Sequence, residues 1–134
     1  KKEIRREYLA IVAGKPEESG TIDLPIARKD SSTIERCIDM DHGEHAVTIT
    51  GVSITGTISL LLVRLRLETG RTHQIRVHMK AIGHPLLGDF LYNPDYRFIG
   101  RQALHSSYGG IPASDHWEAM EFTAPMPEDF SFFY

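Results

Sequence analysis

Hydrophobic and polar positions alternate along much of the chain, and this alternation predicts strands. The clearest case is the segment 59–67, in which every second residue from Leu61 to Leu67 is apolar. On the other face, leucine gives way to Arg64 and Arg66 toward the end of the strand. Further strands are predicted at 8–13, 46–52, 103–106 and 120–124, a short extended segment at 20–26, a turn at 53–57, and a hairpin or mobile excursion at 28–43.

Helical spacing replaces alternation after the strand 59–67. Beyond a turn at Thr69-Gly70, Thr72 offers a hydroxyl that can cap the first turn of a helix, and Gly83 followed by Pro85 predicts its end. The strands and this helix together predict one α+β domain. Its sheet is expected to be mixed but mainly antiparallel, with the helix packed against it.

The predicted helix has two distinct faces. A buried stripe is marked by apolar residues at i, i+4 and i+7, namely Ile75, Met79 and Ile82. A second face holds polar residues at i, i+3 and i+7, namely His73, Arg76 and Lys80. For an arbitrary helix a solvated basic face is the ordinary interpretation. Arg76, however, lies between two apolar positions, where a guanidinium normally has a carboxylate or phosphate partner.

Basic residues are concentrated around this helix, although the chain is slightly acidic overall. The formal net charge is -3, yet five of the 15 Lys and Arg lie between Arg64 and Lys80, where Glu68 is the only acid. Such a patch on an acidic protein indicates a polyanion site. Arg71 lies beside the predicted helix N-terminus, whose free amides also attract phosphate.

Composition excludes several other classes of protein. Hydrophobic residues make up 41% and charged residues 25%, as in ordinary soluble proteins. No apolar run is long enough to span a membrane, so a membrane is not expected as a partner. The single Cys37 excludes an internal disulfide and fits a reducing cytoplasm. No metal site is expected, because His73 and His78 point to different sides of the helix and no Cys or acid completes a ligand set.

The run GRTHQIRVHMKAIGHPLLGDFLY, residues 70–92, resembles the C-terminal signature of the RluA-like pseudouridine synthases. Other segments agree with this family in the same order along the chain. They are REYLAIVAG at 6–14, GTIDLPIAR at 20–28, GEHAVTIT at 43–50, RQALHS at 101–106 and MEFTAPMPEDF at 120–130. The resemblance covers nearly the whole chain.

The resemblance implies isomerisation of uridine to pseudouridine in rRNA or tRNA, with no cofactor or metal and with the target base flipped out of its stack. Tyr8 matches the active-site Tyr that packs on the base and is a candidate for proton handling. Arg76 matches the Arg that pairs with the catalytic Asp. Leu86 or Leu87 is implied as the apolar wall of the base pocket. Contacts with the RNA backbone are implied for Arg71, His73 and Lys80.

The chain departs from the family because it contains no His-Arg-Leu-Asp run, the motif that carries the catalytic Asp. Residues 1–134 are therefore expected to be the C-terminal portion of a synthase catalytic domain and to be inactive alone. Arg76 is then expected to be exposed, to bind an anion or to pair with another acid, because a lone buried charge costs several kcal/mol. Uncovered apolar surface makes self-association an expectation, and Asp89 is expected to cap or bridge a turn.

Two other interpretations remain open. A non-catalytic RNA-binding module could have kept the basic helix after losing the chemistry. A protein-interaction domain could carry the basic stripe incidentally, and absence of salt-dependent RNA binding would favour that interpretation.

Overall fold

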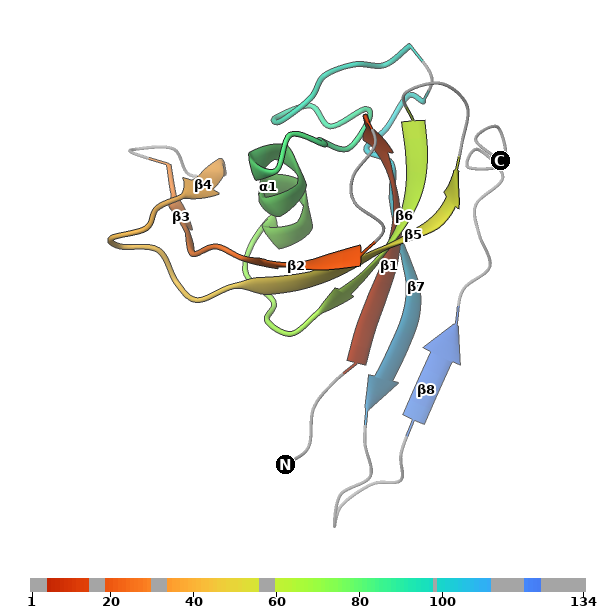
Figure 1. The fold of residues 1–134 in the computed structure, drawn as a ribbon, viewed down its shortest axis with the longest axis horizontal. Coiled ribbons are helices and arrows are strands. Elements are labelled where there is room, and N and C mark those ends of the chain that lie inside the picture. The colour runs from red at the N-terminus through yellow and green to blue at the C-terminus, as the bar shows by residue number, and fades with distance from the viewer. Residues whose placement is uncertain are drawn as a thin grey trace.

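The protein is built on a six-stranded antiparallel sheet with one helix against it (Figure 1). The computed structural model describes residues 5–14, 19–29, 34–55, 60–97, 99–111 and 120–123. The strands of the large sheet are β1 (Arg5–Ala13), β2 (Ser19–Asp23), β5 (Val47–Thr55), β6 (Leu60–Leu67), β7 (Leu104–Ile111) and β8 (Met120–Thr123). Their spatial order is β2-β5-β6-β1-β7-β8. The predicted α+β class is confirmed.

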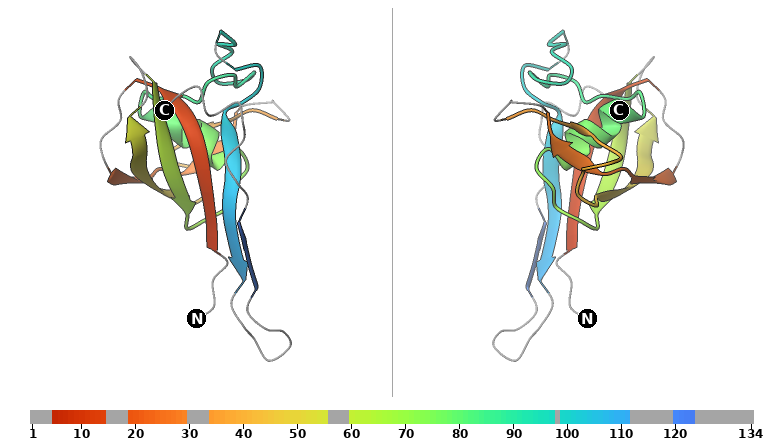
Figure 2. Two further views of the ribbon diagram at one scale, coloured as in Figure 1. Left: turned by 90° about the vertical axis from the view of Figure 1, so that its right-hand side faces the viewer. Right: turned by 90° about the vertical axis from the view of Figure 1, so that its left-hand side faces the viewer.

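Two smaller elements cover one face of this sheet. The helix α1 (Gln74–Ala81) lies between the large sheet and a hairpin formed by β3 (Ile26–Arg28) and β4 (Arg36–Ile38) (Figure 1). Within the segment 28–43, the described residues include β4 and the end of β3, as the hairpin alternative predicts, whereas residues 30–33 lie outside the described residues. Side views show β1, β7 and β8 running together as a ribbon that extends beyond the helix (Figure 2).

The central strand β1 is apolar at consecutive positions because both of its faces are covered. Ala10 and Val12 face α1 and pack with Ile75 and Met79. Leu9 and Ile11 face the other way and pack with Leu87 and residues of the loop that follows. A third cluster, which includes Ile26, Val77 and Tyr92, lies between α1 and the hairpin.

The helix begins one residue later than a Thr72 cap implies, and Thr72 is not its N-cap. His73 occupies that position with a left-handed backbone (φ 57°) and makes no capping side-chain hydrogen bond. Residues 71–74 form a separate turn, closed by the Gln74 amide donating to the Arg71 carbonyl at 3.0 Å. A left-handed residue cannot continue a right-handed helix, so the helix starts at Gln74.

Two smaller predictions are also wrong. Ile82 was placed in the buried stripe, but the helix ends at Ala81 and Ile82 is 38% exposed. The turn predicted at 53–57 is strand as far as Thr55, because β5 continues through a bulge between Val52 and Ile54. Residues 56–59 and 124–134, on which parts of other predictions fall, lie outside the described residues.

The basic residues between 64 and 80 do not form one patch. Arg64 lies opposite Leu9 of β1 in the β1–β6 ladder, so both side chains lie on the sheet face away from α1. Arg66 lies on that same face, opposite Glu7. Strand alternation therefore separates these two arginines from Arg71, Arg76 and Lys80, and the local excess of positive charge is divided between opposite faces.

Candidate active site

A cavity of about 230 Å³ brings together the two residues implied to be catalytic. We call it the Tyr8 cavity. Its lining residues come from β1, the end of β6, the turn before α1, α1 itself, the loop before β7 and the first residue of β7: Tyr8, Leu67, Arg71, His73, Gln74, Ile75, Arg76, Gln102 and Leu104. Of the seven residues predicted for the site, the cavity holds Tyr8, Arg71, His73 and Arg76. Leu86, Leu87 and Lys80 lie elsewhere.

Tyr8 reaches this cavity because it lies on the helix-facing side of β1, where it packs at the edge of the cluster around Ile75 and Met79. No hydrogen bond to its hydroxyl is present in the described part of the chain. The phenol therefore has an apolar ring held by packing and a polar tip that is available to a bound molecule.

Arg76 does not lie exposed in the cavity, because an acid of the same chain holds it. Its Nε donates to Asp89 Oδ2 at 2.7 Å and its Nη2 donates to Asp89 Oδ1 at 2.8 Å, which is a bidentate ion pair. The Asp89 side chain is fully buried and that of Arg76 is 9% exposed. Of the three outcomes expected for Arg76, pairing with another acid is the correct one.

Asp89 is also fixed by its own loop. Its Oδ1 accepts hydrogen bonds from the backbone amides of Leu91 (3.1 Å) and Tyr92 (3.2 Å), so the expected turn-capping role is present as well. Burial alone would raise the pKa of Asp89, but the hydrogen bond from Arg76 and those amides outweigh it and hold the pKa below its usual value. The same pair raises the pKa of Arg76.

Tyr92 is contacted by all three residues of the predicted polar face, namely His73, Arg76 and Lys80. The Arg76 guanidinium lies 5.1 Å from its ring centroid and the Lys80 ammonium 5.8 Å from it. His73 Nδ1 lies 2.9 Å from its hydroxyl. The predicted grouping of His73, Arg76 and Lys80 is thus present, although His73 precedes the helix. Sequence reasoning missed Tyr92 as the partner they share.

The hydrogen bonds of Tyr92 indicate the protonation state of His73. The Tyr92 hydroxyl accepts from the Arg36 amide at 2.8 Å and has its own hydrogen to donate to His73 Nδ1. This arrangement places the proton of a neutral His73 on Nε2. Burial, followed by the nearby charge of Arg76, lowers the pKa of His73 in agreement with a neutral ring. His73 lines the Tyr8 cavity, and its neutral ring keeps one N–H that Tyr92 does not use.

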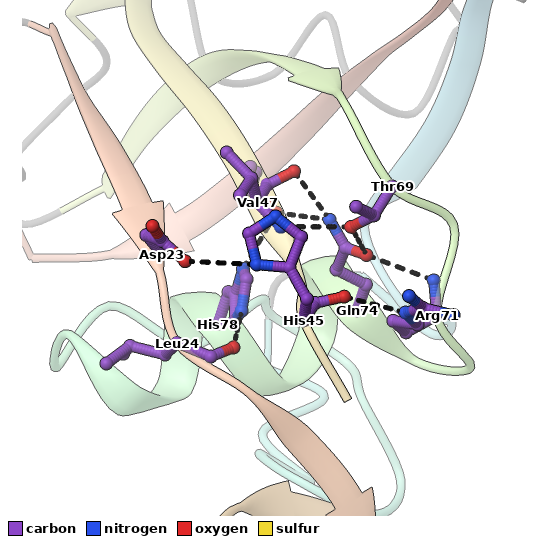
Figure 3. Close-up of polar contacts among 9 residues, drawn as sticks. Asp23, Leu24, His45, Val47, Thr69, Arg71, Gln74 and His78 are labelled. Carbon is purple, nitrogen blue, oxygen red and sulfur yellow. Dashed lines mark hydrogen bonds and ion pairs between the residues drawn. The ribbon is translucent and has the colours of Figure 1, made fainter. Parts of the chain in front are cut away.

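A buried polar network fixes the turn from which the cavity residues project (Figure 3). Gln74 Nε2 donates to the Val47 carbonyl (2.8 Å) and to Thr48 Oγ1 (2.9 Å). Gln74 Oε1 accepts from Thr69 Oγ1 (2.7 Å) and from the Arg71 amide (3.0 Å). Gln74 thus uses its whole hydrogen-bonding capacity to join α1, β5 and the preceding turn.

His78 continues this network, and each hydrogen in it has one place. The Leu24 carbonyl can only accept, so His78 Nε2 donates to it at 2.8 Å. Nδ1 of the neutral ring carries no hydrogen, so it accepts from the Thr48 hydroxyl at 2.8 Å, while the Thr48 oxygen accepts from the Gln74 amide. A second proton on His78 would leave the Thr48 hydrogen without an acceptor. Burial lowers the pKa of this fully buried ring.

We therefore expect His78 to make the stability of the fold fall in mild acid. Its folded-state pKa is below its unfolded value of about 6.5, so the unfolded state binds more protons below that pH. The free energy of unfolding should decrease as pH falls through about 6.5, by up to about 1.4 kcal/mol per pH unit. His78→Gln should flatten this dependence in urea unfolding measured between pH 5 and 7.5. His42→Gln, at an 83% exposed side chain, is the matched control and should not.

Arg71, which lines the Tyr8 cavity, is held in place by contacts with protein oxygens. Its Nε donates to the His45 carbonyl at 2.7 Å, a contact drawn in Figure 3. Its Nη1 lies 3.7 Å from Glu44 Oε2. Arg71 also lines a smaller neighbouring cavity of about 180 Å³ with Arg28 and Arg36. The guanidinium is oriented by protein oxygens but remains partly exposed.

The remaining predicted residues lie outside the Tyr8 cavity. Leu86 and Leu87 are both buried in the core, Leu86 on the helix side of the sheet and Leu87 on the other side. The segment 85–87 pairs with the end of β1 as a short antiparallel bridge, so successive side chains point to opposite faces. Lys80 lines a separate cavity of about 230 Å³ between α1 and the hairpin. Among the described residues, no cluster of three or more His, Cys, Asp and Glu could hold a metal ion, and no helix is long and apolar enough to cross a membrane.

Comparison with known proteins identifies the family. The sequence model of the RNA pseudouridylate synthase family matches residues 1–81, more than half of the chain. An uncharacterised RNA pseudouridine synthase of Bacillus subtilis, YjbO, is 46% identical over 129 residues, covering 96% of this chain and 45% of the relative. Ribosomal large subunit pseudouridine synthase D of Haemophilus influenzae is 40% identical over 146 residues, covering 97% and 44%.

Solved structures agree with these relatives. The human RNA pseudouridylate synthase domain containing 1 protein superposes with a TM-score of 0.84 at 31% identity, covering 96% of this chain and 57% of that chain. The chain belongs to the RNA pseudouridylate synthase family, whose members are isomerases. Its similarity to large-subunit synthase D places it with the RluA-like members, as the motifs indicated. The chain spans less than half the length of the curated relatives described here.

Proposed function

We propose that this chain is the base-binding part of an RNA uridine isomerase that acts on rRNA or tRNA. The observation that carries the proposal is the Tyr8 cavity, where a phenol with a free tip, the paired Arg76 and two further cationic or N–H donors face one space. A flipped uracil needs an aromatic or apolar surface for its ring and donors for its carbonyl oxygens. The reaction itself, isomerisation of uridine to pseudouridine, is inferred from membership of the family.

The chain by itself is proposed to bind RNA without isomerising it. No His-Arg-Leu-Asp run occurs in the sequence, and Asp89, which pairs with Arg76, is fully buried and already accepts three hydrogen bonds on Oδ1. A carboxylate engaged in this way is a poor nucleophile. None of the described residues that line the Tyr8 cavity is an Asp or Glu, so catalysis requires an acid supplied from elsewhere. A cytoplasmic location and self-association of the chain belong to the same proposal.

We propose that RNA crosses the face formed by α1 and the hairpin. Arg71 and His73 lie at the Tyr8 cavity, and Lys80 lies beyond Arg76 at the hairpin cavity, so the three mark a path along the helix. Arg64 and Arg66 lie on the opposite face of the sheet and have no part in this path.

Lys80→Ala is expected to weaken binding of a uridine-containing RNA oligonucleotide severalfold. Losing one phosphate contact should also lower the slope of log affinity against log salt by about 0.7 for a single strand. Lys80 is the suitable choice because its ammonium rests on Tyr92 and makes no ion pair with any described residue, so the fold does not depend on it. Fluorescence anisotropy at several salt concentrations provides the measurement.

Arg64→Ala is the matched control, since it removes an exposed charge of the same sign from the opposite face. It should leave both affinity and salt slope unchanged. Equal losses in the two variants would show that the chain binds RNA through its overall charge and not along α1. Absence of any salt-dependent binding by the unaltered chain would contradict the proposed function itself.

A further inference from the structure

We propose that Asp89 is a positioning residue for the reaction. It fixes the guanidinium of Arg76, so that only the edge of the guanidinium that does not contact Asp89 is presented to the Tyr8 cavity. This inference rests on the proposed function. It assigns to a loop carboxylate a role beyond capping its own turn.

The ion pair divides the hydrogen-bonding groups of Arg76 into two sets. Nε and one N–H of Nη2 are occupied by the two oxygens of Asp89. The two N–H groups of Nη1 and the second N–H of Nη2 remain, and a planar guanidinium must direct them away from Asp89. Because Arg76 also lines the Tyr8 cavity, this remaining edge is the one available to a molecule bound beside Tyr8.

Asp89 is able to fix Arg76 because it is itself held independently. Backbone amides of Leu91 and Tyr92 orient its carboxylate, and its own amide and carbonyl pair with Asn93 at 3.0 and 2.9 Å. The preceding Gly88 has a positive φ of 67°, and a Cβ there would collide with the Arg101 carbonyl. The loop is therefore tightly packed at Gly88, and its backbone hydrogen bonds hold the carboxylate in the direction of Arg76.

Aromatic rings prevent the guanidinium from turning out of this arrangement. The Arg76 guanidinium carbon lies 5.1 Å from the ring centroid of Tyr92 and 5.6 Å from that of Phe90. Cation–π contact with both rings favours one plane for the guanidinium. Arg76 therefore reaches the cavity with its orientation set before any substrate binds, which is the condition under which a donor contributes most to catalysis.

Asp89 also changes what Arg76 does to a second acid. The pair carries no net charge, so a carboxylate that approaches the free edge of Arg76 gains hydrogen bonds but little net electrostatic stabilisation. Arg76 then orients that acid while leaving it reactive. Removing the charge of Asp89 would expose the incoming carboxylate to an uncompensated cation and lower its pKa.

The main test is Asp89→Asn in the protein at its natural length. Misplacement of Arg76 should lower kcat for pseudouridine formation by about 10²-fold, with little change in the KM for RNA. The acid limb of the pH profile of kcat/KM should move to lower pH, which a merely structural substitution would not cause. A variant that keeps the wild-type kcat and pH profile overturns the inference, and the proposed function then stands. Lack of pseudouridine formation by the unaltered protein overturns the proposed function.

A second measurement needs no substitution and does not depend on the variant folding. In NMR spectra of the unaltered chain, the Arg76 Nε–H should exchange slowly with water. Adding a uridine-containing RNA oligonucleotide should perturb the Nη groups of Arg76 and leave the Nε–H protected. If RNA instead removes the protection of Nε–H, Arg76 leaves Asp89 when it binds, and Asp89 does not position it.

Discussion

Replacing Arg76 by Ala is expected to lower the free energy of unfolding of this chain by about 3–5 kcal/mol, because a buried carboxylate then loses its partner. The side chain of Asp89 is fully buried, and two backbone amides cannot compensate for the lost guanidinium. Urea unfolding of the chain near pH 7 measures this loss. A cost below about 1 kcal/mol, the range of an exposed ion pair, would show that water reaches Asp89.

A double-mutant cycle isolates the pair from its surroundings. Arg76→Met alone leaves the Asp89 carboxylate buried and unpaired. Asp89→Leu alone leaves the Arg76 guanidinium buried and unpaired in the same way. Their combination removes both charges and should recover most of the stability, because well-packed apolar pairs often replace a buried ion pair without loss. The contribution of Asp89 to the free energy of unfolding also depends on pH in a defined direction. The pKa of Asp89 is lowered in the fold, so this contribution is complete above about pH 4 and is lost as pH falls below that value.

This geometry changes how one activity experiment must be interpreted. The family resemblance implies that Arg76→Ala abolishes catalysis while folding survives. Since Arg76 holds a buried acid of the same chain, its removal destabilises the fold as well. Loss of activity in that variant would not by itself identify a catalytic role.

Tyr8→Phe gives the cleaner result and the largest expected effect on catalysis. If the Tyr8 hydroxyl handles a proton, its removal should lower kcat for pseudouridine formation by about 10²–10⁴-fold. Stability should hardly change, because the ring remains packed and the hydroxyl has no hydrogen-bond partner in the described part of the chain. The measurement is release of the hydrogen from carbon 5 of uridine, with the protein at its natural length.

Tyr96→Phe is the matched control, since Tyr96 is 49% exposed and does not line the Tyr8 cavity. It should retain full activity. Tyr8→Leu extends the comparison, because it removes the ring as well and should weaken RNA binding in addition to kcat. Wild-type turnover by Tyr8→Phe would leave the ring, and not the hydroxyl, as the contribution of this residue.

Local pattern was enough to predict most of the scaffold. Strands β1 and β6 follow from runs of apolar residues at the spacing of a sheet, and the stop after α1 follows from Gly83 and Pro85. The start of α1 was missed because Thr72 looks like a cap in sequence. The turn is instead organised by the side chain of Gln74, which reaches β5.

The site was predictable only as far as its residues follow a regular period or a family motif. Tyr8 and Arg76 were matched by motif, and the structure brings them to one cavity. The pairing of Arg76 with Asp89 depends on the fold of a loop 13 residues away, which no period encodes. Division of the arginines between two faces follows from alternation in β6, whereas a local excess of charge along the chain says nothing about the face on which each residue lies.

Tyr92 has a mechanical consequence for the whole site. One phenol ring ties the backbone of the hairpin at Arg36 to His73 at the start of the helix, and it also supports Arg76. A bound strand that pushed the hairpin aside would have to break the contact with Arg36 and so loosen the support under the guanidinium. Binding of the nucleic acid and alignment of the reacting groups thus both depend on the contacts of Tyr92.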